Sequence, residues 1–324
     1  MKFQKKRTMI YFFLLLIIAG AIFINHKLQP PTRLNPIFKS TEAKHRFYKA
    51  YDTAMLAWNT PYFAKDVNTS FGSTHINICG DENKPPLVLL SIMTFSSVSW
   101  YPNIRELSKH FKIYSIDIIG DHNRSEASRL LPDKKHFADW LFEVLNILKL
   151  DKVNIAGESY GGFITLSFAL YHPEMVNKAI LIAPAATLTD WKFPVKAFIT
   201  VVKIFPTIIP SDYNAAFKIF SDYPEKVDIR VKGVLKSVYK EGIASQLITP
   251  QEFTENELRQ VKTKTLVMIG EHEPNYDYND ALQRAEKFMP NVTGLMVPNA
   301  KHLVNIDQPE IVNKKMIEFL LSSK

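Results

Sequence analysis

The sequence contains little cysteine and little glycine, and both shortages are informative. A single cysteine in 324 residues, Cys79, leaves no partner for a disulfide within the chain and excludes a zinc site built from several thiolates. Glycine occurs 11 times, about half of its ordinary frequency, so a cluster of glycines marks a place where the backbone requires them. The content of apolar residues (46%) and of charged residues (22%) is ordinary for a globular protein and argues against global disorder.

Acidic residues are absent from the first 33 residues, and this absence explains most of the net charge. The chain has 40 Lys and Arg against 32 Asp and Glu, which gives a formal charge of +8. Six of the basic residues fall in residues 1–33, so the rest of the chain carries only +2. We expect no nucleic-acid partner, because the body lacks the excess of positive charge that a polyanion attracts.

The N-terminus has the pattern of a membrane-directed segment. Lys5, Lys6 and Arg7 precede an almost unbroken apolar run, and residues 8–25 together reach 18 residues, the short end of the range for a spanning helix. We expect an uncleaved membrane anchor over residues 1–25, with the lipid bilayer as the partner of residues 8–25; a secretory signal peptide is the alternative. The basic flank favours the cytoplasmic side. The expected location is therefore the cell membrane, single-pass, with the body outside the cytoplasm, or secretion after cleavage.

Three prolines in residues 26–37 predict a short stiff stalk, and the folded body is expected over residues 38–324. Strand-like and helix-like segments alternate through this body, which predicts an α/β fold with a mostly parallel central sheet and helices on both faces. Strands are expected at 74–79, 86–92, 112–119, 153–156, 178–183, 265–269 and 293–297. Helices are expected at 100–111, 135–150, 160–171, 279–289 and 310–321.

A segment at about 187–260 interrupts this alternation. The sheet is complete without it, and its first part is rich in Phe, Val and Ile. We interpret it as an inserted helical cap over one end of the sheet, although an ordinary run of surface helices would also fit. An apolar insertion over one end of the sheet would form part of the lining of an apolar substrate pocket.

Three of the 11 glycines lie within six residues, in the sequence VNIAGESYGG around Ser159. Ser159 stands in a G-x-S-x-G pattern between an expected strand and an expected helix, the context of a sharp strand-to-helix elbow. Such an elbow exposes the serine hydroxyl at the C-terminal edge of the sheet, where open α/β sheets place their sites. The backbone N–H of Tyr160, at the start of the helix, can donate to a developing oxyanion.

A serine nucleophile needs a base, and the base needs an acid that orients it. In the order Ser, acid, His, the base is predicted to be His302, which follows the strand at 293–297. The acid is expected after the strand at 265–269, where Glu273 is our choice and Asp277 the alternative. Asp190, after the strand at 178–183, is a third possibility.

These motifs resemble the α/β-hydrolase family, in particular carboxylesterase-type serine hydrolases with an N-terminal membrane anchor. The resemblance covers roughly residues 40–322 and is carried by GESYGG, FSSVSWYPNIRELS (95–108), YSIDIIGDHNRS (114–125), GEHEPNYD (270–277) and PNAKHLVNIDQPEIV (298–312). It implies a catalytic triad of Ser159, Glu273 and His302. It also implies ester hydrolysis through an acyl-enzyme, on a small-molecule ester that the cap suggests is apolar in its acyl part. No cofactor and no metal are implied.

One departure from the family pattern concerns the second oxyanion donor. The family usually ends its third strand in His-Gly, and here that place holds Ser91-Ile92. The resemblance assigns the second donor to the backbone N–H of Met93, which a side-chain change need not remove, but Ile restricts the backbone more than Gly does. The alternative function is therefore a membrane-tethered, catalytically decayed hydrolase that acts as a binding protein.

Overall fold

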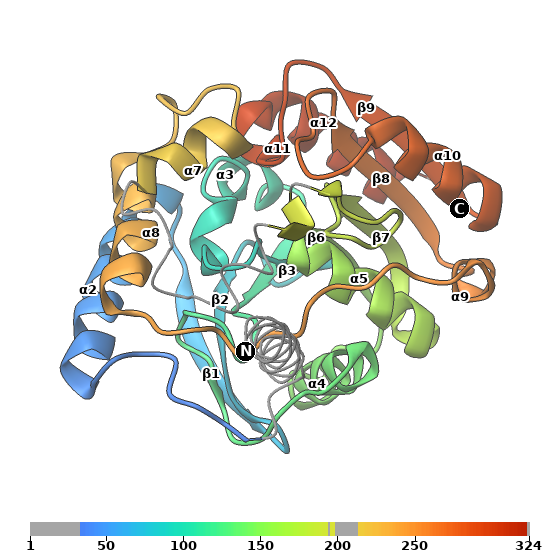
Figure 1. Ribbon diagram of the computed structural model, residues 1–324. Coiled ribbons are helices and arrows are strands. Elements are labelled where there is room, and N and C mark those ends of the chain that lie inside the picture. Colours follow the sequence, from blue (N-terminus) through green and yellow to red (C-terminus); the bar gives the residue numbers. More distant parts are fainter. Residues whose placement is uncertain (1–32, 194, 198–212, 323–324) are drawn as a thin grey trace, which may run out of the picture.

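The computed structural model describes residues 33–193, 195–197 and 213–322 of the chain. One sheet runs through this part in the strand order β1-β2-β4-β3-β6-β7-β8-β9, and a two-residue strand, β5, pairs with β2 (Figure 1). β2 is antiparallel to β1, β4 and β5, whereas all neighbours from β4 to β9 are parallel. The strands are β1 (Phe63–Thr69), β2 (Gly72–Cys79), β3 (Pro86–Leu90), β4 (Lys112–Ile116), β5 (Glu126–Ala127), β6 (Val153–Glu158), β7 (Val176–Ile182), β8 (Lys264–Gly270) and β9 (Val292–Val297).

Helices cover both faces of the sheet, which confirms the expected α/β-hydrolase architecture. Along β3, Val88 and Leu90 join one hydrophobic cluster while Leu87 and Leu89 join the other, because successive side chains of a strand point to opposite faces. The first cluster includes α4, α5 and α10, and the second includes α2, α3 and α12. The α-helices are α2 (Thr41–Met55), α3 (Ile104–Leu107), α4 (Lys134–Ile147), α5 (Tyr160–Tyr171), α7 (Tyr213–Phe220), α8 (Ile229–Glu241), α9 (Glu255–Gln260), α10 (Tyr278–Phe288), α11 (Val304–Asp307) and α12 (Pro309–Leu321). Short 3₁₀ turns are η1 (Leu56–Trp58), η2 (Ser96–Trp100) and η3 (Pro173–Met175).

Two parts of the body differ from the prediction. The expected helix at 100–111 is instead η2 followed by the single turn of α3, because Pro102 lacks the N–H that would continue a helix. Helix α2 and strand β1 were not expected. β1 lies at the sheet edge with only Val67 buried, so its sequence lacks the alternation of a half-buried strand.

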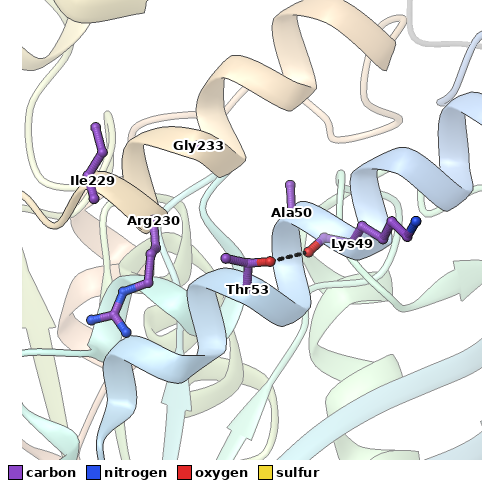
Figure 2. A pocket seen from close by; sticks show the side chains of 6 residues that line it. All are labelled: Lys49, Ala50, Thr53, Ile229, Arg230 and Gly233. Carbon is purple, nitrogen blue, oxygen red and sulfur yellow. Dashed lines mark hydrogen bonds between the residues drawn. The ribbon is translucent and has the colours of Figure 1, made fainter.

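Helices α7, α8 and α9 come from the segment at 187–260. α8 packs along α2, and Figure 2 shows the residues that line the groove between them: Lys49, Ala50 and Thr53 of α2 and Ile229, Arg230 and Gly233 of α8. By contrast, α9 buries Leu258 in the same hydrophobic cluster as α10. The end of the segment is therefore part of the sheet's own core.

The N-terminal predictions fall mostly outside the described residues. The anchor at residues 1–25 and most of the stalk at 26–37 belong to the part that the structure does not describe. At the end of the stalk, the carbonyls of Asn35 and Ile37 accept hydrogen bonds from Gln246 Nε2 (2.5 Å) and the Ile243 amide (2.8 Å). Within residues 33–193, 195–197 and 213–322, no helix combines the length and apolarity that crossing a bilayer requires.

Candidate active site

Ser159 sits on a strained turn between β6 and α5. Its backbone has φ 52° and ψ −112°, a conformation that residues with a side chain rarely adopt. Its amide donates to the Ile182 carbonyl (2.8 Å) and its carbonyl accepts from the Ala185 amide (3.0 Å), so the loop after β7 holds the turn. A Cβ on Gly157 would lie 2.1 Å from the Gly161 carbonyl oxygen. The elbow therefore closes only because position 157 is glycine.

His302 and Glu273 form a hydrogen-bonded line with Ser159. His302 Nε2 lies 2.8 Å from Ser159 Oγ, and His302 Nδ1 lies 2.8 Å from Glu273 Oε2. His302 comes from the loop between β9 and α11, and Glu273 from the loop after β8. The three residues are only 5 to 6% exposed, so their interactions operate where water screens them weakly. A serine hydroxyl beside an imidazole that a carboxylate orients can act as a nucleophile.

Asn275 belongs to this group, although the sequence did not single it out. Its amide donates to Glu273 Oε1 at 2.9 Å, and its side-chain amide lies 3.0 Å from His302 Nδ1. The backbone contact fixes one oxygen of Glu273 and leaves the other for the imidazole. The hydrogen bond from the Asn275 amide to the Glu273 carboxylate, two residues earlier, is a local turn contact that a sequence pattern can indicate. The contact between Asn275 and the distant His302 has no such local signal.

The alternative acids are occupied elsewhere. Asp277 is exposed and caps α10, where its side chain accepts from the amides of Asn279 (2.9 Å) and Asp280 (3.2 Å). Asp190 is exposed and pairs with Lys196. Of the three acids that the sequence offered, only Glu273 contacts His302.

The amides of Tyr160 and Met93, the two expected oxyanion donors, have no hydrogen-bond acceptor in the described part of the chain. Gly161 N–H donates to the Ser91 carbonyl (3.1 Å) and so joins the end of β3 to the start of α5. Ile92 is not among the described residues with positive φ, so replacing a glycine at this position introduces no backbone strain there. This removes the structural motive for the decayed-hydrolase alternative.

A second carboxyl group, Glu158, lies directly before the nucleophile. It is fully buried, and neither carboxyl oxygen has a hydrogen-bond partner in the described residues. Burial raises the pKa of Glu158 well above its usual value; the nearby Asn305 backbone N–H lowers this pKa in part, and the carboxylates of Asp307 and Glu273 raise it further. Burial therefore favours the neutral form of Glu158, and Glu273 is the carboxyl group that contacts His302.

Aromatic side chains of α7 lie next to this line. The Phe220 ring centroid is 5.8 Å from that of His302, and Phe217 makes an edge contact with Phe95 at 5.7 Å. The Leu303 amide donates to the Phe220 carbonyl (2.9 Å), which ties the end of α7 to the loop that carries His302. Helix α7 thus supplies apolar surface beside the imidazole.

Other features of the described residues do not suggest a second chemistry. The open groove between α2 and α8 contains none of the predicted site residues (Figure 2). In the same part of the chain, His, Cys, Asp and Glu side chains form no group of three or more that could hold a metal ion.

Comparison with known proteins places the chain in a family. Residues 85–220 match the family described as alpha/beta hydrolase fold. Carboxylesterase YbfK of Bacillus subtilis (strain 168) is 33% identical over 287 residues, which are 87% of this chain and 96% of that protein. The crystal structure of naproxen esterase (carboxylesterase NP) from Bacillus subtilis matches with a TM-score of 0.81 at 29% identity, over 87% of this chain and 99% of that one. With this fold and these relatives, the chain belongs to the α/β-hydrolase family, as one of its carboxylesterase-type enzymes.

Proposed function

We propose that the protein hydrolyses carboxylic esters with Ser159 as nucleophile, His302 as general base and Glu273 as the orienting acid. The observation that carries this proposal is the unbroken, buried line of 2.8 Å contacts from Glu273 through His302 to the serine on the strained elbow. In this role Glu273 accepts the Nδ1–H of His302, which leaves Nε2 free to take the serine proton.

The reaction then follows from the positions of these atoms. Ser159 Oγ attacks the ester carbonyl as His302 Nε2 accepts its proton, and the amides of Tyr160 and Met93 donate to the oxyanion that develops. His302 returns the proton to the leaving alcohol and an acyl-enzyme remains. Water that His302 deprotonates then releases the acid and restores the serine.

The proposed substrate is an ester whose acyl part is largely apolar. Phe220 of α7 supports this, because its ring lies beside the His302 ring with centroids 5.8 Å apart, and Phe217 of the same helix packs against Phe95. An apolar acyl group would gain about 25 cal/mol for each Å² removed from water. Chain length in the acyl group should therefore raise kcat/KM until the pocket is filled.

A panel of p-nitrophenyl esters from acetate to decanoate, together with naproxen methyl ester, tests this function on the full chain. Ser159→Ala should lower kcat/KM by about 10⁴ or more and abolish labelling by a fluorophosphonate. Ser167→Ala is the matched control, because Ser167 is also buried, on the helix α5 that follows the elbow, and within the described residues its hydroxyl donates only to the Phe163 carbonyl of that helix. Turnover or labelling that persists in Ser159→Ala would contradict the proposal, and indifference to acyl length would contradict the apolar substrate.

We also propose that residues 8–25 anchor the protein in the cell membrane, with the catalytic body outside the cytoplasm. The support is the sequence alone: a basic cluster followed by 18 residues without charge. The full chain should stay with membranes after a carbonate wash, and a chain without residues 1–25 should not. Recovery of the full chain in the soluble fraction would contradict the anchor and, in culture medium, would favour a cleaved signal peptide.

A further inference from the structure

The loop between β3 and η2 has an unusual backbone. The Phe95 amide donates to the Ile92 carbonyl (3.3 Å), which closes a turn over residues 92–95. Thr94 occupies the third position of this turn with φ 79°, a value that type II turns reserve for glycine or asparagine. A β-branched side chain disfavours that conformation, so a contact outside the turn must hold it.

Asp121, in the loop after β4, supplies such a contact. Its Oδ2 accepts the Thr94 amide at 2.6 Å, and its Oδ1 accepts the His122 amide at 2.8 Å. The residue is 1% exposed, and in the described part of the chain its ion-pair contact is with His122 Nδ1 (3.5 Å), not with a Lys or Arg. Two backbone amides therefore hold this buried carboxylate, one of them in the strained turn.

The contact fixes the peptide next to the proposed oxyanion donor. With the Thr94 N–H directed at Asp121, the Met93–Thr94 peptide plane can no longer rotate. On the other side, the Ser91 carbonyl is held by Gly161 N–H (3.1 Å). The Ile92–Met93 peptide, which carries the Met93 N–H, thus lies between two fixed points. Asp117 holds the end of the same loop, since its Oδ1 accepts the Ser97 amide (3.0 Å).

We infer that Asp121 is a positioning residue for the oxyanion hole: its carboxylate imposes the left-handed turn at Thr94 and thereby directs the Met93 N–H toward the reacting carbonyl. The inference rests on the proposed function, because it needs an oxyanion opposite Ser159. Glycine would adopt the positive φ at position 94 without help, whereas Thr94 is held in it by the hydrogen bond to the buried Asp121 carboxylate.

The Asp121→Asn variant tests this role. An asparagine side chain can accept one of the two amides and turns an NH₂ group toward the other, so the turn loses its restraint. A whole oxyanion donor is worth on the order of 10²–10³ in rate, and a displaced one should cost about 10–100-fold in kcat with KM within about threefold. Affinity for a trifluoromethyl ketone, whose hemiketal oxygen occupies the hole, should fall by the same factor as kcat/KM. Affinity for the product acid should not change.

Thr94→Gly provides the rescue. Glycine adopts φ 79° without strain, so a turn with glycine at position 94 no longer depends on the Asp121 contact. The double variant Asp121→Asn with Thr94→Gly should have a kcat at least about tenfold higher than that of Asp121→Asn alone. Asp52→Asn is the control, because Asp52 is exposed and pairs only with Arg124. If Asp121→Asn does not fold, Asp121→Glu is used instead. It keeps the negative charge but moves the acceptor oxygens by one methylene, so kcat should fall by the same factor.

The outcomes separate the two proposals. Wild-type turnover that does not depend on Ser159 would overturn both. Turnover that depends on Ser159 but is unaffected at Asp121 would overturn the positioning role alone. A lower kcat with unchanged affinity for the ketone, or without rescue by Thr94→Gly, would also overturn it.

Discussion

Replacing Glu273 by glutamine is the sharpest test of the proposed acid. Glu273 makes two contacts, Oε1 with the Asn275 amide at 2.9 Å and Oε2 with His302 Nδ1 at 2.8 Å. Glutamine has only one acceptor oxygen. If that oxygen faces Asn275, its NH₂ faces His302 Nδ1, which must then become an acceptor and leaves the proton on Nε2. Histidine in that tautomer cannot accept the serine proton.

The opposite orientation does not avoid the loss. With the glutamine oxygen turned to His302, its NH₂ meets the Asn275 amide, and unsatisfied buried donors cost about 1–3 kcal/mol. The negative charge that stabilises the imidazolium is also gone. The same exchange in a Ser-His-Asp triad lowers kcat by about 10⁴, which corresponds to about 5.5 kcal/mol at 1.36 kcal/mol per tenfold. We expect a loss of this size in kcat for Glu273→Gln, measured at saturating ester.

Asp277→Asn is the matched control, because asparagine caps a helix about as well as aspartate. This variant should keep kcat within about twofold and should melt close to the wild-type temperature. Glu273→Gln with more than about a tenth of wild-type kcat, or a hundredfold loss in Asp277→Asn, would refute the assignment of the acid.

Two further predictions concern stability. Because the pKa of Glu158 is raised in the folded protein, the unfolded chain loses the Glu158 proton at a lower pH than the folded chain does. As pH rises above the unfolded pKa, the free energy of unfolding of the wild type should therefore fall by up to about 1.4 kcal/mol per pH unit, and that of Glu158→Gln should not. Urea titrations of both proteins at pH 5 and pH 8 measure this difference. Equal pH slopes for the two proteins would contradict a neutral buried Glu158. Gly161→Ala should lower the free energy of unfolding by about 1–3 kcal/mol, because the new Cβ would lie 2.3 Å from the Leu90 carbonyl oxygen. Gly233→Ala, which meets nothing within 4 Å on α8, should instead raise it by about 0.4–1 kcal/mol; thermal melts that reverse this order would contradict the packing argument.

Much of the sheet could be predicted because its strands are buried on both faces. The run Leu87–Leu90 is apolar at every position, and the structure buries each of these side chains. β1 carries no such signal, since its pairing with β2 depends on backbone contacts and only Val67 is buried. Helix α2 spaces Phe47, Tyr51 and Ala54 along one buried face, but the polar residues between them weaken the helical pattern in the sequence.

The sequence by itself determined the elbow around Ser159, because closely spaced glycines between a strand and a helix form a pattern of consecutive residues. Chain order then indicated His302, and left Glu273 and Asp277 open. Only the tertiary structure decided which carboxylate contacts His302, since that depends on how the loop after β8 folds against the loop after β9. The same holds for the contacts of Asn275 with His302 and of Asp121 with Thr94, each of which joins residues 27 apart in sequence. Contacts of this kind form when separate strand ends meet at one edge of the sheet, and no local pattern encodes that meeting.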